Sequence, residues 1–349
     1  YEIRLSLVGS EMCIRDSTYA MAQNEALYYD GLPLQYTKRD LERFKDGTNP
    51  NYYPNVNWYK EGTRNFSENN QFNVMMRGGG KRVRYMALLD YKNKFGLLNE
   101  DYTHYSDRYN SQIRTYELGL RMNLDVDITS STRMKFGLYG IIGEDKRPNT
   151  DINTIFQNFY KVPAAAFPVK TLNNNWGSNT LFKMNPIAAI ADVGYVQENR
   201  RMLETDMRIT QDFSMFLKGL SAEVAVAYDN TATFQDIGSK TYKYEVGYLS
   251  EEGLPVSETY GTDSKVQITK SVLSAQLIRA SVEAKLNYDY TSGKHQLSAS
   301  AVYRQDMKEP LENNASYYRQ NIMGFVGYNY GNRYMVDVVG NYYGTSVLL

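Results

Sequence analysis

The sequence predicts an all-β fold, a partial transmembrane antiparallel β-barrel with a short mixed segment before it. Three observations lead to this prediction. Apolar and polar residues alternate with period 2, the alternating segments are unusually long, and short connections between them alternate with long ones. We expect about ten strands, which would form an arc of a barrel.

The clearest alternation runs over residues 116–128. The even positions carry Tyr, Leu, Leu, Met, Leu, Val and Ile, whereas the odd positions include Glu117, Arg121 and Asp125. Successive side chains of a strand point to opposite faces, so one face of this strand is expected to be apolar and the other charged. A helix would instead repeat its apolar residues every three and four positions.

The same alternation recurs along the chain. We expect strands at 70–78, 82–95, 111–128, 132–144, 199–213, 219–231, 270–290, 294–305, 317–330 and 333–343. Several of them exceed the ~9–11 residues that a tilted strand needs to cross a bilayer. They also exceed the ~5–6 residues typical of soluble strands. Their length therefore favours a membrane barrel over a soluble β-sandwich.

The connections between these strands alternate in length. Short turns are expected at 78–81, 129–131, 214–218, 291–294 and 330–333. Long connections are expected at 96–110, 145–198, 232–269 and 306–316. Outer-membrane barrels sort their connections in this way, with tight periplasmic turns and long extracellular loops.

Tyrosine is abundant, with 32 residues, and several tyrosines are expected near strand ends beside short turns. Tyrosine rings favour the interface between membrane and water, although the β-propensity of tyrosine gives a simpler explanation. The tyrosines in question are Tyr288, Tyr290, Tyr328, Tyr330, Tyr342 and Tyr343.

The composition argues against several classes of protein. The 39 basic and 39 acidic residues balance, whereas a nucleic-acid-binding protein normally has a basic excess. The two histidines have no ligand partners at metal spacing, and no nucleophile–base set can be assembled. We therefore expect no enzyme, no cofactor, no metal and no nucleic-acid partner. The mean hydropathy of -0.55 fits a barrel, because alternate strand residues face a wet lumen.

Two motifs have both a chemical and a structural interpretation. Residues 78–81 (GGGK) lack the G-x-x-x-x-G-K-[ST] spacing of a phosphate loop, so we expect a hairpin turn. Asp125 and Asp127 share a face and could act as acid and base or bind a cation. A solvated barrel wall is the favoured interpretation of this pair.

The N-terminal region departs from the strand pattern. Residues 5–17 resemble translated sequencing-adapter read-through, so residues 1–17, with Cys13, are expected to be non-native. Residues 346–349 look like an interrupted strand, so the chain is expected to be a fragment. Residues 21–27 are helical in composition, and residues 38–45 (KRDLERFK) are expected to form a short charged helix that ends at 46–50.

Several short segments resemble a known family. They are NEA (24–26), DGL (30–32), YPN (53–55), NWY (57–59) and the hairpin 72–85. These segments are similar to the end of the plug and the entry to the barrel in SusC/RagA-type TonB-linked outer-membrane transporters. Residues 121–125 (RMNLD) and 328–334 (YNYGNRY) also look like features of this family.

The resemblance implies a 22-stranded barrel closed by a plug. Residues 18–57 would be the end of the plug and its linker, and residues 58–349 part of the barrel. The intact protein would lie in outer-membrane lipid and import oligosaccharides or peptides. Energy would come from the TonB–ExbB–ExbD complex, and a SusD-like lipoprotein would cover the outer face. The TonB box, most of the plug and about half of the barrel would lie outside this chain.

The long connection 145–198 holds the candidate ligand or lid contacts. They are Phe156, Phe159, Tyr160 and Trp176, interleaved with asparagines that include 173–175. Sugar faces stack on aromatic rings and amides bind hydroxyls, so this composition suits a glycan. The alternative is a loop that packs on the lid or on itself. Two other functions stay open for the chain, a passive outer-membrane porin and a soluble cell-surface β-sandwich that binds a ligand.

Overall fold

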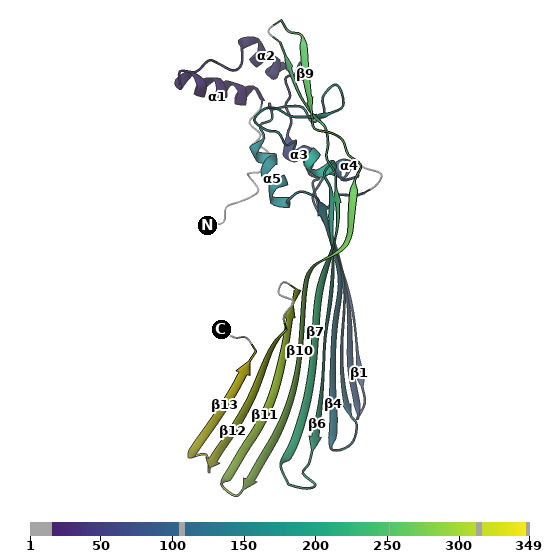
Figure 1. The fold of residues 1–349 in the computed structure, drawn as a ribbon, viewed down its shortest axis with the longest axis vertical. Helices are drawn as coiled ribbons and strands as arrows, with labels where there is room; N and C mark the ends of the chain where they lie inside the picture. The colour runs from purple at the N-terminus through teal and green to yellow at the C-terminus, as the bar shows by residue number, and fades with distance from the viewer. Residues whose placement is uncertain (1–15, 105–108, 251, 312–315, 347–349) are drawn as a thin grey trace.

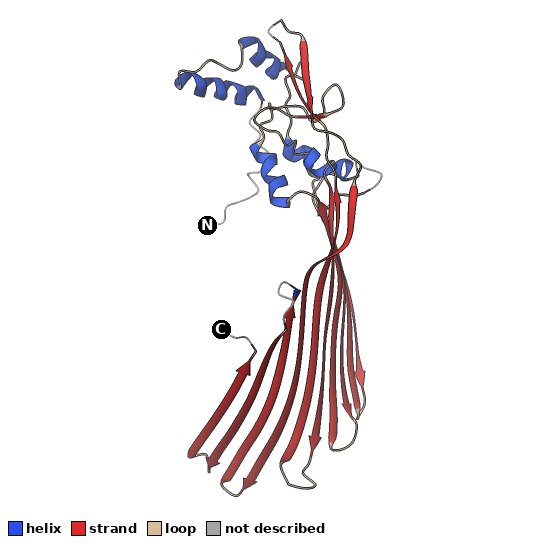
Figure 2. Cartoon of the chain, in the orientation of Figure 1, coloured by secondary structure: helices blue, strands red, loops and turns tan. Residues whose placement is uncertain are grey.

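The computed structural model describes residues 16–104, 109–250, 252–311 and 316–346, and it has two parts (Figure 1). The first is a ten-stranded antiparallel sheet, which we call the wall. The second, the head, consists of the described residues of 16–67, 96–113, 149–193 and 240–266, and it lies beyond one end of the wall. The wall is all strand, whereas the head mixes short helices with a small sheet (Figure 2).

The strands of the wall follow one another in chain order, so every neighbouring pair is antiparallel. They are β1 (Glu68–Gly79), β2 (Val83–Phe95), β3 (Arg114–Asp127), β4 (Thr132–Pro148), β6 (Gly194–Asp212), β7 (Leu220–Ser239), β10 (Gln267–Ser292), β11 (His295–Pro310), β12 (Tyr317–Tyr330) and β13 (Tyr334–Thr345). All ten correspond to strands predicted from the sequence. The sheet does not close among the described residues, because β1 and β13 are its two edges.

Five strands extend at least three residues further into the connections than predicted. β4 continues to Pro148, β6 begins at Gly194, β7 continues to Ser239, β10 begins at Gln267 and β11 continues to Pro310. The β6–β7 ladder is continuous over its extension, from Gly194 opposite Ser239 to Asp212 opposite Ser221. Alternation fades there because both faces carry polar residues, and the backbone ladder continues with side-chain contacts such as that of Gln235 Nε2 with Glu198 at 3.0 Å.

The predicted sorting of the connections is confirmed at all but one position. Short connections at 80–82, 128–131, 213–219, 293–294 and 331–333 lie at one end of the wall, and long connections at 96–113, 149–193 and 240–266 lie at the other end. The predicted long connection at 306–316 is wrong, because β11 continues to Pro310 and β12 begins at Tyr317, so this connection is shorter than the turn 213–219. The GGGK motif ends β1 in the first short turn, where Gly80 N donates to Val83 O at 2.7 Å. The hairpin interpretation of that motif is therefore confirmed.

One face of the wall is apolar across its strands. Tyr85, Leu124, Phe136, Met207 and Val226 are successive neighbours across five strands at one level. Many such side chains are exposed, including Leu120 at 39%, although a soluble sheet would bury them. A β-sandwich would cover this face with a second sheet, but the three-stranded sheet of β5, β8 and β9 lies in the head (Figure 2).

This apolar face is a band with an upper limit. Two positions above Tyr91 and Ile142, the same face carries Asn93 and Glu144. Glu144 pairs with Asn199 across the strands and accepts a hydrogen bond of 3.2 Å from Gln197 Nε2. On β3 the band runs from Val126 up to Leu118, about the ~9–11 residues that cross a bilayer.

The tyrosine predictions have two outcomes. Tyr288 and Tyr290 lie beside the turn 293–294 with their rings stacked, centroids 6.4 Å apart. Tyr342 and Tyr343 lie at the other end of their strand, opposite Ile322 and Asn321. Their predicted place beside a short turn is therefore wrong, because β13 runs on well beyond the turn 331–333.

The head contains the described helices and the small sheet. They are α1 (Asp16–Tyr29), α2 (Lys38–Asp46), α3 (Trp58–Gly62), α4 (Glu100–Thr103), α5 (Ile152–Lys161), α6 (Ala188–Ala191), β5 (Trp176–Gly177), β8 (Tyr244–Leu249) and β9 (Pro255–Tyr260). The predicted charged helix is α2, whose Thr37 and Asp40 form a capping box and which Gly47 ends at φ +65°. No described helix has the length and hydropathy needed to cross a membrane.

Segments from all four parts of the chain share the core of the head. Trp58, Leu98, Ile155, Phe167 and Ile187 are all buried in it. A second, smaller cluster joins α1 and α2 to the long connections, with the buried residues Ala20, Phe44, Tyr53 and Ala165. The head is therefore a small folded unit and not a set of separate loops.

The N-terminal segment lies at the long-connection end of the wall. α1 and α2 sit there, with Leu249 of β8 packed against their shared cluster, and β1 runs from this end toward the short turn 80–82 (Figure 1). That residues 18–57 are the end of a plug stays a prediction. Of the suspected non-native stretch, residues 1–15, with Cys13, lie outside the described residues, and Asp16 and Ser17 begin α1.

Candidate functional site

Two of the four candidate contact residues are core residues. Phe159 is 4% exposed and Trp176 is 2% exposed, both in the main core of the head. Trp176 Nε1 also donates a hydrogen bond of 2.9 Å to Asp192 Oδ2, another buried group. A ligand on the surface cannot reach these rings, so they hold the head together. Of the interpretations weighed from the sequence, packing of the connection on itself describes these two residues.

The other two candidates lie nearer the surface. Tyr160 is 58% exposed, and its ring lies 5.9 Å from that of Tyr59. Phe156 is partly buried against the core and meets Phe159 edge to face at 5.6 Å. Of the four candidates, Tyr160 presents the most surface to a ligand or a partner, and its contact stays a prediction.

The helix that positions these rings is visible in the sequence. Ile152, Ile155, Phe156 and Phe159 have the i, i+3, i+4, i+7 spacing of an amphipathic helix. Asp151 caps its first turn, with its carboxylate accepting from Thr154 N at 2.9 Å. The prediction of one long connection over 145–198 misses α5, which this periodicity identifies.

The asparagines of the same connection have an internal partner. Glu245 of β8 is 3% exposed, and its carboxylate accepts hydrogen bonds from Asn173, Asn175 and Thr171 at 3.0, 2.7 and 3.1 Å. Ser178 N donates 3.0 Å to the Glu245 carbonyl. Asn173 and Asn175 therefore bind a buried carboxylate of the protein itself, a contact that sequence spacing could not reveal.

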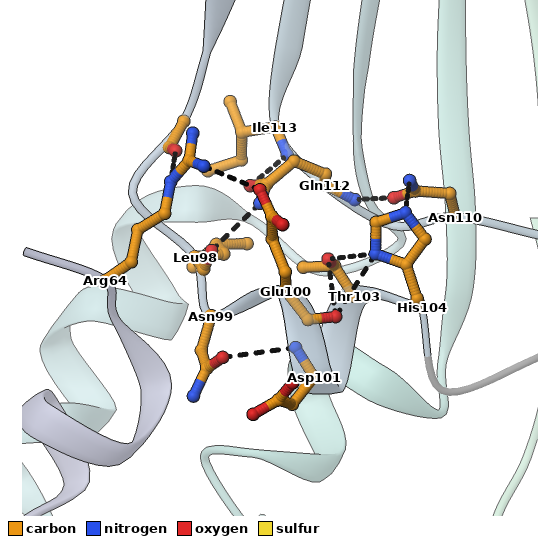
Figure 3. A network of polar contacts seen from close by, with 11 residues as sticks. Arg64, Leu98, Asn99, Glu100, Asp101, Thr103, His104, Asn110, Gln112 and Ile113 are labelled. Atoms are coloured by element: carbon orange, nitrogen blue, oxygen red, sulfur yellow. Dashed lines mark hydrogen bonds and ion pairs between the residues drawn. The ribbon is translucent and has the colours of Figure 1, made fainter. Parts of the chain in front are cut away.

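A network of polar contacts lies in the head where the connection 96–113 follows β2 and precedes β3 (Figure 3). Arg64 pairs with Glu100 at 2.6 Å and donates 3.0 Å to the Gly96 carbonyl through Nε. Gln112 Nε2 donates 2.9 Å to the Leu98 carbonyl. His104 lies at the edge of this network, where its Nε2 is 2.6 Å from Asn110 Nδ2. These contacts fix the point where the connection 96–113 leaves the wall.

Burial perturbs ionisable groups in the head. Burial lowers the pKa of Lys170 to about 8, and its Nζ lies 3.3 Å from the centre of the Trp176 ring. Burial, followed by the charge of Asp192, raises the pKa of Tyr242 to about 12. Asp192 itself is 4% exposed and pairs with Lys240. These groups support one another within the core and do not form a nucleophile–base set.

The second face of the wall carries ion pairs across the strands. Glu117 pairs with Lys92 at 3.1 Å and with Arg200 at 2.7 Å. Arg200 reaches Glu117 across Gly143, which has no side chain to block it. Asp127 pairs with Arg133 at 2.7 Å and with Arg84 at 3.3 Å. Asp127 is thus an ion-paired residue of a charged wall, and its arrangement is not that of an acid–base pair.

Solved structures share this architecture. The chain is similar to the RagAB peptide transporter, with a TM-score of 0.56 at 14% identity, over 95% of this chain and 37% of that one. The RagAB peptide importer in the open-open state gives a TM-score of 0.53 at 14% identity, over 97% of this chain and 37% of that one. The wall has the fold of part of a transporter barrel. The chain spans little more than a third of the transporter chains that it matches.

No protein-family model and no curated protein matches the sequence. At 14% identity the likeness establishes the fold and leaves activity to be argued from this chain. The arrangement itself offers three surfaces: an apolar outer band, a charged opposite face and a folded head at the end where the long connections lie.

Proposed function

We propose that this chain forms part of the wall and outer face of a TonB-dependent importer in the cell outer membrane. The observation that carries the proposal is the two-faced wall. One face is an exposed apolar band of bilayer height, and the other is lined with cross-strand ion pairs. Lipid suits the first face and a water-filled lumen suits the second.

The sorted connections give the wall a direction. Tight turns belong on the periplasmic side of an outer-membrane barrel, so the head would lie outside the cell. A folded head in this place can present a substrate-facing surface. Following the SusC/RagA resemblance, a SusD-like lipoprotein would cover it, and the exposed side chains for such a contact include Tyr160, Tyr28, Tyr29, Leu32 and Leu34.

The cargo in this proposal is an oligosaccharide or a peptide. The SusC/RagA resemblance supports both, and the fold is shared with transporters described as importing peptides. Energy would reach the protein from TonB–ExbB–ExbD through parts that lie outside this chain.

The test is uptake by cells that produce the natural protein containing this chain. Fluorescently labelled oligosaccharides and oligopeptides are supplied, with and without deletion of TonB and with and without a protonophore. Import that disappears in both treatments supports the proposal. Import that continues at the same rate identifies a passive porin and overturns it.

A further inference from the structure

A hollow of about 750 Å³ lies on the charged face of the wall. It is formed by β7, β10, β11 and β12 and is open to solvent. The charged side chains that line it are Asp229, Arg279, Arg304, Asp306, Lys308 and Arg319. Four of these six are cations, which sets this hollow apart from the neutral composition of the chain.

One of the four cations, Arg304, is already ion-paired within the protein. Arg304 donates to Asp306 from Nε and Nη2, at 3.0 and 2.8 Å, and lies 3.5 Å from Glu283. Asp306 is therefore committed to Arg304, although it lies directly opposite Arg319 in the β11–β12 ladder. Arg319 forms no ion pair with another described residue.

The other two cations face each other. Lys308 lies directly opposite Arg279 on one side and Tyr317 on the other, so neither cross-strand neighbour is an acid. Like charges that face each other across strands destabilise a sheet. Asp229 lies opposite Arg279 on its far side, next to another acid, Glu204. Neither Arg279 nor Lys308 makes an ion pair within the described part of the chain.

A second pair of facing cations, Lys135 and Arg208, is placed differently. Asp125 lies directly opposite Lys135, and Arg208 pairs with Glu223 at 3.3 Å. In the hollow, Asp229 lies opposite Arg279 but no acid lies opposite Lys308, so four cations share two acids. A bound anion would relieve the repulsion between Arg279 and Lys308, and the guanidinium groups can bind carboxylates with two hydrogen bonds each.

We propose that this hollow binds a ligand with two or more carboxylates. The proposal rests on the proposed function, in which this face lines the import path, and it narrows the cargo to an acidic oligopeptide or a uronic-acid oligosaccharide. Arg279 and Arg319 lie two strands apart and two residues apart along the strands, which is about 12 Å. Carboxylates four residues apart in an extended peptide point to the same side and span about 13 Å.

The test is binding to the purified protein in detergent, measured by isothermal titration calorimetry. The probes are pentaglutamate and trigalacturonate, with pentaglutamine and maltotriose as neutral counterparts. We expect the acidic probes to bind and the neutral ones to bind at least about tenfold more weakly, with affinity falling as salt rises. Binding of only one acidic probe identifies which source of carboxylates the hollow takes.

The decisive variant is the double substitution Arg279→Gln with Lys308→Gln. It is expected to weaken binding of the acidic probe by about tenfold or more. The matched control is Lys135→Gln, a cation on the same face outside the hollow, which should leave affinity unchanged. If the double variant does not fold, Lys308→Gln alone carries the test, because its side chain is exposed.

Equal affinity for acidic and neutral probes, or unchanged affinity in the folded variant, overturns this inference. No acidic probe binding at all has the same consequence. The measurement needs no energy coupling, so it can fail while TonB-dependent uptake succeeds. Equally, binding can be observed in a protein whose uptake proves passive.

Discussion

The wall and the head differ in how far they expose their leucine side chains to solvent. Leu98 in the head is fully buried among residues from four separate segments, whereas Leu120 in the wall is 39% exposed on a face of similar side chains. Both tryptophans of the chain, Trp58 and Trp176, lie in the core of the head. The head therefore buries its apolar side chains by its own packing, whereas the apolar face of the wall needs a surrounding other than water to cover it.

This difference separates the forces that stabilise the two regions. The head is held by enclosed packing and by hydrogen bonds to buried groups such as Glu245 and Asp192. The wall is held by its backbone ladders and ion pairs, and its apolar face gains its hydrophobic stabilisation only in lipid. Substitutions of the same kind should thus have different consequences in the two regions.

The largest effect is expected from Leu98→Ala. Removing a fully buried leucine side chain leaves a cavity and should lower the free energy of unfolding of the head by ~2–5 kcal/mol. Urea unfolding followed by tryptophan fluorescence reports on the head alone, because both tryptophans lie there. The matched control is Leu120→Ala, which should leave this transition in place. Equal effects of the two variants would contradict the comparison.

Charge on the apolar face tests the wall. Leu120→Arg places a cation at the middle of the band and should cost ~2–4 kcal/mol of stability in a lipid bilayer. The measurement is reversible folding of the natural protein into lipid vesicles. The control is Asn123→Arg on the same strand, whose side chain is on the charged face. If Leu120→Arg folds into vesicles as stably as that control, the band does not face lipid.

Replacing the carboxylate of Glu245 should destabilise the head by a smaller amount. Glu245→Gln keeps the shape but brings an amide group against the donors Asn173, Asn175 and Thr171. At least one donor loses its acceptor, which should cost ~1–3 kcal/mol. Tryptophan fluorescence during urea unfolding measures it, with the exposed Glu258→Gln as control. An unchanged midpoint would show that these three hydrogen bonds do not stabilise the head.

The sequence revealed the wall better than the head for a physical reason. Alternation with period 2 follows directly from a strand that has lipid on one side and water on the other. Residues 116–128 show this alternation because each side chain there faces either lipid or water. Where β6 and β7 rise above the band they meet the head, as the ring contact of Tyr195 with Tyr109 and the burial of Val196 show, and the pattern that predicts their ends is lost.

In the head, local patterns indicate single helices such as α2 and α5, but they do not predict how these helices pack together. The core of the head joins residues as distant in sequence as Trp58 and Ile187, and no local pattern specifies such contacts. The same limitation affected the candidate site, because aromatic rings in a polar connection suit both a sugar and a core. Phe159 and Trp176 belong to the core, and only Tyr160 is well exposed. The cations of the hollow lie on three strands, so only the register brings them together.

The smallest effect concerns the alkaline stability of the head. The pKa of Lys170 is lowered to about 8 in the folded head, below its unfolded value near 10.5. Between these values the unfolded state binds the proton and the folded state does not, so stability rises as the pH increases from about 8 to 10. Since the side chain is partly exposed, solvent screening reduces this gain to about 1 kcal/mol.

The variant Lys170→Met should remove that rise, because it has no proton to lose. The control is Lys183→Met, an exposed lysine of the same connection, which should retain it. Above about pH 10 both variants should lose stability, since Tyr242, with its pKa raised to about 12, stays protonated only in the folded head. Urea midpoints by tryptophan fluorescence at several pH values measure both trends. A rise that persists in Lys170→Met would assign it to another group.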